Sequence, residues 1–213
     1  MRIAMIGTGP VGRTLGEGLM KVGHDVLVGS RAPDRTRARD DWRGVELPLL
    51  SYGEVGLSAD LFINATSGAN SLEALKAVGA ETLGGKVLID MANPLDNSKG
   101  FPPPLLTCNT NSLAEQLQWA FPNTRVVKAF NTVTVAVLVN PKAFGGQDTT
   151  MFLAGNDAEA RATVAGIASD LGWTDVIQFD DLTAARGLEM WLPLWIRLFR
   201  HFGTTMFNIK VVR

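Results

Sequence analysis

Cysteine and histidine are scarce in this chain. Its 213 residues include one cysteine, Cys108, and two histidines, His24 and His201. A single cysteine cannot form an internal disulfide or a four-cysteine metal site, and two histidines are too few for a convincing metal cluster. His24 lies in a turn before a strand pattern. His201 lies at the end of an apolar helix pattern, where a cation interacts favourably with the helix dipole. We therefore expect no metal and structural roles for both histidines.

An excess of charge and a long hydrophobic run are also lacking. The formal net charge is −1, so nothing indicates nucleic acid as a partner. The most apolar run, "MWLPLWIRLF", contains Pro193 and Arg197 and is shorter than the roughly 20 residues of a membrane span. The first strand pattern starts at Arg2, which leaves no room for a signal or transit peptide. These features predict a globular, cytoplasmic protein with no membrane contact.

Short aliphatic runs alternate with helical patterns along most of the chain. The runs predict strands at 2–7, 25–30, 60–66, 86–92, 125–130, 150–155 and 175–180. Between them, helical spacing occurs at 11–21, 71–78, 112–120 and 157–171. Apolar strands separated by helices are typical of a mainly parallel sheet covered on both faces. The sequence therefore predicts an α/β fold.

The last helical pattern, at 187–202, differs from the others. It is apolar on nearly every side, with one polar stripe at Glu189, Arg197 and Arg200. Such a helix is usually buried on two sides. Its own sheet and a second subunit could provide these contacts, which favours a homodimer. Alternatively, the helix only covers the hydrophobic end of one monomer.

Glycines are concentrated at the first strand-to-helix junction, "GTGPVG", which matches the pattern G-x-G-x-x-G. Gly7 permits a tight turn, Gly9 lets the backbone approach a pyrophosphate, and Gly12 lets helix and strand pack closely. Gly16, one turn later, is expected to extend this close packing. The strand–turn–helix context indicates a Rossmann-type, doubly wound dinucleotide-binding domain. The alternative is a glycine-rich turn without a ligand.

The end of the second strand pattern distinguishes NADP from NAD. NAD-binding chains carry an acidic residue there, whereas this chain has Ser30 and Arg31. A hydroxyl and a guanidinium suit a 2′-phosphate, and Arg35 could add a second charge, with Arg37 also within reach. The sequence thus predicts an NADP-binding domain at 1–180. The alternative is a solvated basic loop diluted by nearby aspartates.

Several motifs occur in an order that resembles a known family. They are "GTGPVG", "VGSR", "DMANPL", "VVKAFNT", "FLAGND" and "FNIKVV", which together span nearly the whole chain. The chain resembles the coenzyme F420-dependent NADP oxidoreductases, a group that includes NADPH-dependent reductases and the reductase domain of the STEAP metalloreductases. The resemblance implies a compact, usually dimeric subunit in which NADPH meets a flat acceptor in a cleft at the strand ends.

The resemblance also implies positions for each part of the cofactor. The pyrophosphate would lie against the glycine turn, the 2′-phosphate against the basic segment, and the nicotinamide beside two later strand ends. The implied cofactor-binding residues are Gly7, Thr8, Gly9, Pro10, Val11, Gly12, Ser30, Arg31, Arg35, Ala65, Thr66, Asn93, Pro94, Ala129, Phe130 and Asn131. Residues 181–213 would form a C-terminal helical segment that contributes to the acceptor cleft and the dimer contact.

No side chain stands out as a general acid. The region "DLTAARGLEMWLPLW" lacks the lysine that hydroxyacid dehydrogenases with a similar first domain carry on a later helix. Reduction of a carbonyl or imine usually needs an acid, whereas hydride transfer to a flavin or deazaflavin does not. The absence favours an acceptor such as F420, with Trp191 and Trp195 as walls of the cleft. Asp180, Asp181 and Arg186 could shape the acceptor pocket, but capping of the last helix by Asp180 or Asp181 is favoured.

Alternatives to F420 remain at this stage. The segment "NATSGAN" is small and polar, whereas members committed to F420 tend to be apolar here, with a proline or tryptophan. Free flavin, an electron-accepting partner or an unidentified small substrate could replace F420. A different class of function is a non-catalytic module that binds NADPH and reports redox state to a partner. A reductase needs open space beside the nicotinamide, and a sensor does not.

Overall fold

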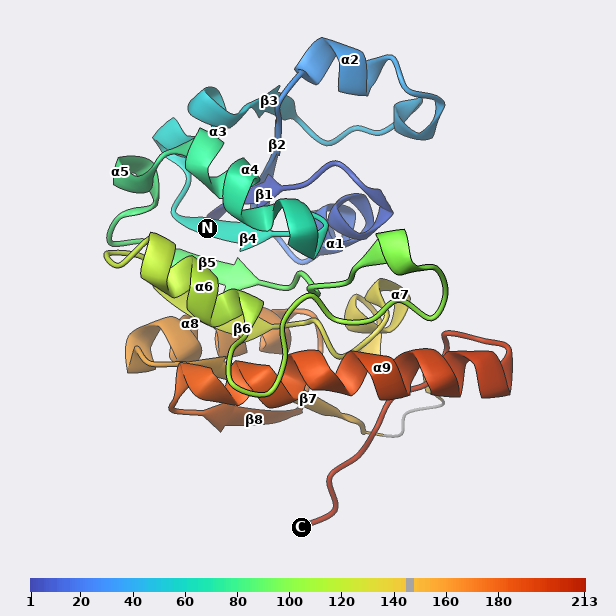
Figure 1. Ribbon diagram of the computed structural model, residues 1–213. Coiled ribbons are helices and arrows are strands. Elements are labelled where there is room, and N and C mark those ends of the chain that lie inside the picture. The colour runs from blue at the N-terminus through green and yellow to red at the C-terminus, as the bar shows by residue number, and fades with distance from the viewer. Residues whose placement is uncertain (145–147) are drawn as a thin grey trace.

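The protein is built on one twisted sheet. The structure, a computed structural model, describes residues 1–144 and 148–213, and these contain an eight-stranded sheet of order β3-β2-β1-β4-β5-β6-β7-β8 (Figure 1). The strands are β1 (Arg2–Ile6), β2 (Asp25–Ser30), β3 (Leu49–Ser51), β4 (Leu61–Asn64), β5 (Val87–Asp90), β6 (Arg125–Ala129), β7 (Thr150–Gly155) and β8 (Asp175–Phe179). Among these described strands, neighbours pair in parallel except β6 with β7, which are antiparallel.

The strands expected from the aliphatic runs are confirmed, and their ends differ by at most two residues. The mainly parallel, doubly wound α/β architecture is therefore confirmed as well. The edge strand β3 was not predicted from the sequence. Its three residues, "LLS", are too short a run to show strand periodicity.

The longer helices also lie where helical spacing predicts them. They are α1 (Pro10–Lys21), α4 (Ser71–Val78), α6 (Leu113–Ala120), α8 (Ala158–Asp170) and α9 (Ala185–Phe202). The sequence did not predict α2 (Pro33–Arg37), α3 (Tyr52–Ser58), α5 (Ala80–Leu83) and α7 (Val135–Leu138). These helices have four to seven residues, and fewer than two turns give almost no periodic signal. Single 3₁₀ turns occupy Asp40–Trp42, Gly68–Asn70, Asn97–Lys99, Pro141–Phe144 and Leu182–Ala184.

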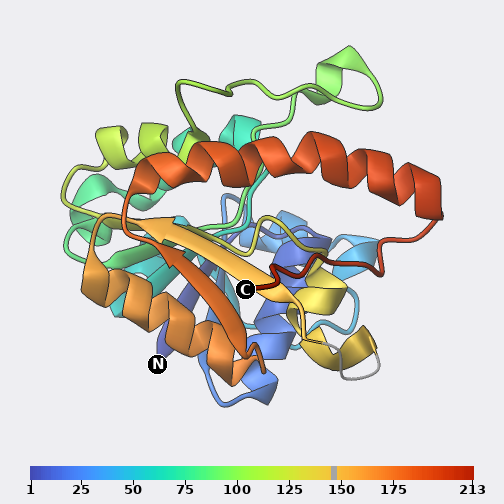
Figure 2. The same cartoon turned by 90° about the horizontal axis from the view of Figure 1, so that it is seen from below.

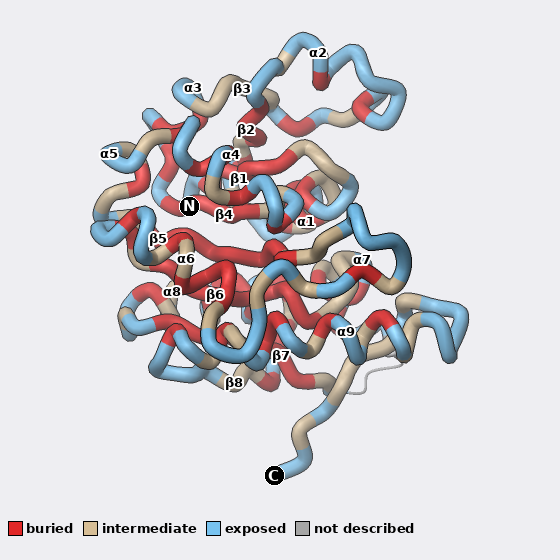
Figure 3. Tube along the Cα trace, in the orientation of Figure 1, coloured by how far each residue is buried: buried red, intermediate tan, exposed pale blue. Residues whose placement is uncertain are grey.

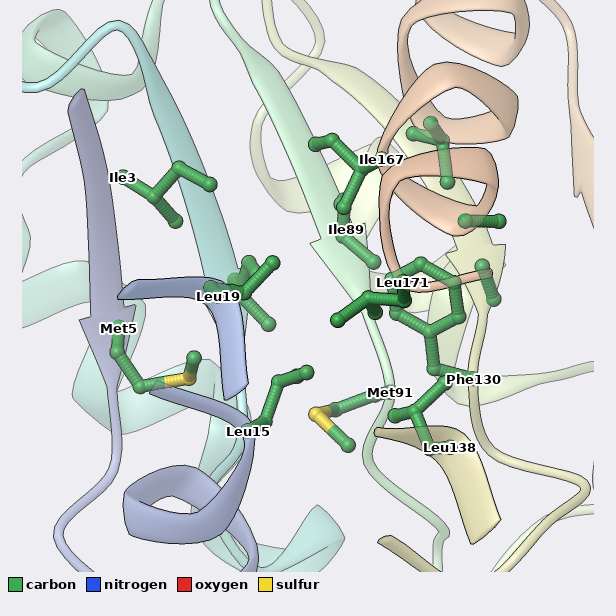
Figure 4. Close-up of a cluster of buried hydrophobic side chains, with 14 of the residues drawn as sticks. Ile3, Met5, Leu15, Leu19, Ile89, Met91, Phe130, Leu138, Ile167 and Leu171 are labelled. Atoms are coloured by element: carbon green, nitrogen blue, oxygen red, sulfur yellow. The ribbon is translucent and has the colours of Figure 1, made fainter. Parts of the chain in front are cut away.

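Helices cover both faces of the sheet, and each face has its own hydrophobic cluster. On one face, Leu15 and Leu19 of α1 point toward Met91 and Leu171 (Figure 4). The helices α1, α7 and α8 form this layer, whereas α4, α6 and α9 lie on the opposite face (Figure 2). The six inner strands between these layers are buried along most of their length, whereas the edge strands β3 and β8 are more exposed (Figure 3). Because helices cover both faces, ligands are expected at the carboxyl ends of the strands, as in other open α/β sheets.

The last helix, α9, presents one buried side and one exposed side. Its buried residues are Ala185, Leu188, Glu189, Leu192 and Ile196. Glu189, which the sequence pattern assigns to a polar stripe with Arg197 and Arg200, lies instead on the buried side of the helix. It is 1% exposed, and its carboxylate pairs with a buried lysine. Met190, Leu194 and Phe202 leave apolar surface on the other side of the helix. No described helix has the length and hydropathy needed to span a bilayer.

The chain after α9 returns to the sheet. Gly203 ends the helix in a left-handed conformation (φ 67°). The amide of Thr150, the first residue of β7, donates to the carbonyl of Ile209. The side chains of Lys210 and Arg213 bind the two carboxylate oxygens of Asp175 at 2.8 and 2.7 Å. These contacts hold the C-terminal segment against the start of β7 and β8.

Candidate functional site

The turn between β1 and α1 is packed as the glycine pattern predicts. Gly7 has a φ of +132°, and a Cβ on it would lie 2.5 Å from the carbonyl oxygen of Ala65. A Cβ on Gly12 would lie 2.5 Å from the carbonyl oxygen of Gly7, and Gly16 packs closely against Leu47. A Cβ on Gly9 would have no described atom within 4 Å. The turn is therefore closed toward the protein and open on the side of Gly9.

A cavity of about 780 Å³ begins at this opening and extends past the end of β2. We call it the first cavity. It lies at the carboxyl ends of the strands, where the order turns from β1 to β4, the usual ligand position in open α/β sheets. Its lining residues are Gly7, Thr8, Gly9, Ser30, Arg31, Ala32, Arg35, Thr36, Arg39, Tyr52, Ala65, Thr66, Ser67, Asn70, Glu73 and Ala74.

The far end of the first cavity is hydroxyl-rich and basic. The Ser30 hydroxyl is 2.8 Å from the Thr36 hydroxyl and accepts from the amide of Ala32 at 3.1 Å. Arg31 and Arg35 line the cavity and form no ion pair with any residue in the described part of the chain. Two guanidinium groups without counter-charges beside a hydroxyl pair form a suitable site for a phosphate group.

Arg37 does not contribute to this site. Its guanidinium donates to the carbonyls of Val45 and Leu47 at 3.1 and 3.4 Å and lies over the Trp42 ring. These contacts hold the side chain away from the first cavity, so the expectation for Arg37 is wrong. Two residues further on, Arg39 does line the cavity. Arg37 is the last residue of α2, whereas Arg39 lies after the helix, so helical spacing in the sequence could not rank the two arginines.

A cavity of about 430 Å³ adjoins the first and shares Gly9, Ala65, Thr66 and Ser67 with it. We call it the second cavity. Its other lining residues are Pro10, Val11, Gly68, Met91, Ala92, Asn93, Leu95, Asn97, Phe130, Asn131, Val133, Thr134, Val135, Leu192 and Trp195. The wall formed by α9 comes from Leu192 and Trp195, which lie one turn apart on the helix. Trp195 stacks on Phe207 of the C-terminal segment, with ring centroids 5.2 Å apart.

Two asparagines at the strand ends are joined in the second cavity. The side-chain amide of Asn131 donates to the Asn93 side-chain oxygen at 3.0 Å and to the Leu188 carbonyl at 2.9 Å. The Asn93 side chain donates in return to the Asn131 carbonyl at 3.2 Å. Between β6 and Asn131, Phe130 has a left-handed backbone (φ 67°), an uncommon conformation for a bulky residue. The predicted pair at the strand ends is thus a preorganised polar surface connected to α9.

Some residues expected at the site have other positions in the described structure. Pro94 and Ala129 are buried and line neither cavity, and Gly12 acts through packing against Gly7. The indole N–H of Trp191 donates to the Thr132 carbonyl at 2.9 Å, so of the two expected tryptophans only Trp195 is a wall of the described cavity. The proline and the alanine are immediate chain neighbours of residues that do line it.

Asp181, one of the two aspartates before α9, has a structural role. The Asp181 carboxylate accepts from the Thr183 amide at 2.8 Å and caps the 3₁₀ turn that leads into the helix. Arg186 forms a two-point ion pair with Glu115 at 2.9 and 2.5 Å. Neither residue lines the first or the second cavity. Asp181 therefore caps the 3₁₀ turn and not α9 itself, whose N-cap Ala184 provides no side-chain hydrogen bond, so the prediction that an aspartate caps the last helix is wrong.

A buried charge cluster lies behind the second cavity and was not predicted. Lys128 of β6 is fully buried, and its Nζ is 2.8 Å from both an Asp90 and a Glu189 carboxylate oxygen. Burial alone would lower the pKa of Lys128, but the two carboxylates outweigh it and raise the pKa. Burial raises the pKa of Glu189, and Lys128 offsets this only in part. The same Nζ donates to the Ala92 carbonyl at 2.5 Å, directly before Asn93.

Other lining residues had weak sequence signals. Ser67 directly follows Ala65 and Thr66 at the same strand end, so extending the strand-end rule by one residue would have found it. Tyr52 begins α3, and Arg39 precedes a 3₁₀ turn; neither belongs to a recognisable motif. Burial raises the pKa of Tyr52, which keeps its hydroxyl neutral.

Comparisons with known proteins agree with this geometry. The family model described as "NADP oxidoreductase coenzyme F420-dependent" matches residues 2–94. The crystal structure of a candidate F420-dependent NADP reductase from Arthrobacter sp. FB24 superposes with a TM-score of 0.96, at 47% identity over 100% of both chains. The F420-dependent NADP reductase of Methanocaldococcus jannaschii is 29% identical and covers 93% of this chain and 92% of its own length.

A longer relative contains an equivalent segment. Metalloreductase STEAP3 of Rattus norvegicus is 28% identical over 91% of this chain. The chain spans 38% of the length of that relative.

Proposed function

The chain belongs to the family of coenzyme F420-dependent NADP oxidoreductases, and we propose that it transfers a hydride between NADP(H) and coenzyme F420 or a similar flat, flavin-like acceptor. The observation that carries this proposal is the junction of the two cavities at Gly9 and Ala65. The first cavity suits the phosphates and adenosine of the cofactor. The second offers room beside the nicotinamide for another ring.

The first cavity provides distinct groups for each phosphate. The pyrophosphate would lie against residues 8–11, where the open side of Gly9 and the free amides at the start of α1 attract anions. Ser30, Arg31 and Arg35 would hold the 2′-phosphate. Since two of these groups are arginines without counter-charges among the described residues, phosphate binding requires no ion pair to be broken there.

The second cavity would hold and align the nicotinamide. Ala65 and Thr66 would line the path from the adenosine, and Asn93, Phe130 and Asn131 would lie beside the ring, with Pro94 and Ala129 supporting them from behind. Bound NADPH supplies the hydride. The side chains of Leu192 and Trp195 would exclude water and present a flat apolar wall to the acceptor. Alignment and exclusion of water are the main demands of hydride transfer between such rings.

The open second cavity favours an enzyme over a sensor. A protein that only binds NADPH requires no space beyond the nicotinamide itself, whereas the second cavity, at about 430 Å³, is larger than that one ring and leaves room for an acceptor. A reductase of an unidentified small substrate is the second candidate, because the polar residues Ser67, Asn93 and Asn131 line the same space. Its substrate would have to be reduced without a side-chain acid.

The proposal also assigns different roles to two segments of the chain. Residues 1–180 would form the NADP-binding domain, and residues 181–213 would provide the wall of the acceptor cleft and the contact with a second subunit. The exposed apolar residues of α9, among them Leu194 at 52% exposure, support a homodimer. A small-molecule acceptor and a cytoplasmic setting complete the proposal.

An anaerobic turnover assay tests the reaction. Purified protein would be mixed with NADPH and F420, and the loss of the oxidised deazaflavin absorbance would be followed, with FMN and FAD in parallel reactions. We expect rapid reduction of F420. Turnover with the flavins alone would show that the protein is a reductase whose acceptor is a flavin and not F420. No turnover with any of them, despite tight NADPH binding, would contradict the proposed reaction.

A further inference from the structure

Arg39 occupies a position at the glycine turn that no sequence motif assigns. Its guanidinium lines the first cavity, and one of its nitrogens donates to the Thr8 hydroxyl at 3.1 Å. Thr8 is the residue between the two glycines of the turn. A permanent positive charge therefore lies beside the turn, where the phosphates of a dinucleotide are expected.

The charge of Arg39 is already balanced by one neighbour. Its guanidinium forms a two-point contact with Asp41, at 2.8 and 2.5 Å, and both side chains are 40% exposed. This contact with Arg39 lowers the pKa of Asp41, so the carboxylate is ionised at neutral pH. Asp41 has a second cationic neighbour, Arg13 of α1, at 3.2 Å. If Arg39 turned toward an entering anion, Asp41 would still have a partner.

The backbone of this segment is anchored, whereas the side chains of Arg39 and Asp41 are each 40% exposed. The indole N–H of Trp42 donates to the Thr8 carbonyl at 2.9 Å, and Trp42 is 1% exposed. The 3₁₀ turn Asp40–Trp42 therefore holds residue 39 beside the turn. Only rotation of the Arg39 side chain is needed to exchange one anionic partner for another.

From this geometry we propose that Arg39 is a phosphate-binding residue for NADP(H), and that Asp41 holds its guanidinium until a cofactor phosphate replaces the carboxylate. The proposal rests on the proposed function, in which the first cavity takes NADP(H). It adds a third guanidinium to Arg31 and Arg35, with a built-in counter-ion. The Arg39–Asp41 pair is exposed and contributes little net stability, so its exchange for a bidentate guanidinium–phosphate contact costs little.

Two variants of the same ion pair separate this role from a structural one. Arg39→Gln removes the guanidinium, whereas Asp41→Asn keeps it and removes only its counter-charge. A merely structural ion pair predicts weaker cofactor binding in both variants. Phosphate binding by Arg39 predicts opposite effects: weaker binding in R39Q and tighter binding in D41N.

The matched control is Arg43→Gln. Arg43 lies four residues further on, pairs with Asp40 at 2.9 Å and is 84% exposed, and it does not line the first cavity. Dissociation constants for NADPH and NADH would be measured by fluorescence titration on the full chain and on each variant. We expect about a tenfold increase for NADPH in R39Q, a decrease of a few-fold in D41N and no change in R43Q.

The two cofactors distinguish the phosphate groups that Arg39 could bind. Loss confined to NADPH identifies the 2′-phosphate, and equal loss for NADPH and NADH identifies the pyrophosphate; either result supports the proposal. Binding in R39Q that equals binding in R43Q would overturn it, as would weaker binding in D41N. An unmodified chain that binds neither cofactor would overturn the proposed function itself, and the proposal for Arg39 with it.

Discussion

Lys128 and Glu189, 61 positions apart, meet in the interior with the Nζ and a carboxylate oxygen 2.8 Å apart and both side chains almost fully buried. Their contact joins β6 to α9. The Glu189 carboxylate also accepts hydrogen bonds from the backbone amides of Leu113 and Ala114, at 2.9 and 3.2 Å, at the start of α6. The wall of the second cavity is therefore positioned by a buried ionic group as well as by apolar packing.

The first prediction concerns the stability of this cluster. Lys128→Met retains the length and apolar stem of the side chain but leaves the carboxylates of Asp90 and Glu189 buried without a cation. We expect the free energy of unfolding to fall by about 3–5 kcal/mol, as measured by urea denaturation. Lys76→Met is the control, since its pair with Glu73 is exposed and should contribute less than about 1 kcal/mol. Equal effects in the two variants would contradict the prediction.

The second prediction concerns stability at acid pH. Asp175 accepts from Lys210, Thr150 and Arg213, and these contacts hold the pKa of its carboxyl well below the ordinary range. A lowered folded-state pKa stabilises the fold above the unfolded-state pKa, near 4, and this contribution is lost as the pH falls through the folded-state value. Asp175→Asn should therefore be less stable than the unmodified chain at neutral pH.

The measurement is urea denaturation of both proteins at a series of pH values. The difference in the free energy of unfolding should be constant above about pH 5 and shrink below about pH 4. Asp40→Asn is the control, because its partner pair with Arg43 is almost fully exposed. A difference between D175N and the unmodified chain that does not change with pH would show that the carboxylate charge is not responsible.

The third prediction separates two glycines of the same turn. Gly9→Ala introduces a Cβ into open space at an ordinary backbone conformation (φ −78°), so the thermal midpoint should hardly change. The methyl group would intrude on both cavities, and NADPH binding should weaken at least about tenfold. Gly12→Ala would force a Cβ against the Gly7 carbonyl and should cost about 1–3 kcal/mol of stability. Calorimetry and fluorescence titration of both variants check this; a stable G12A or a destabilised G9A would refute it.

The fourth prediction concerns the choice between NADP and NAD. Ser30→Asp with Arg31→Ala replaces a hydroxyl and a cation by a carboxylate at the expected position of the 2′-phosphate. NADPH binding should weaken by about a hundredfold relative to NADH, corresponding to one or two lost charge-assisted contacts. Dissociation constants for both cofactors provide the measurement. An equal loss for the two cofactors would remove the argument for NADP.

The fifth prediction concerns the oligomeric state. The proposed dimer buries the exposed apolar side of α9, so Leu194→Glu should convert it to a monomer. Leu57→Glu is the control, because Leu57 is 86% exposed on α3, away from α9. Light scattering after size exclusion reports the mass of each variant. A monomeric unmodified chain, or dimers in both variants, would contradict this interface.

Local patterns in the sequence were sufficient to predict the main strands, the longer helices and the part of the site that lies at the ends of β1 and β2. Aliphatic runs and helical spacing depend on neighbouring residues alone, so they predicted the main strands and longer helices. The glycine turn and Ser30 with Arg31 are likewise local, because each belongs to one strand end. The edges of open α/β sheets gather such strand ends, which is why distant motifs could be assigned to one site.

Tertiary structure decided the contacts between distant segments. Glu189 belongs to an apolar helix, and nothing in its neighbourhood indicates that it meets Lys128 rather than water. Arg39 instead of Arg37 reaches the first cavity because Trp42 anchors the segment to Thr8, more than 30 residues away. Burial of a charge or rotation of an arginine depends on which segments pack together. The sequence therefore determined which chemical groups the strand ends carry, and the packing of distant segments decided which of them meet.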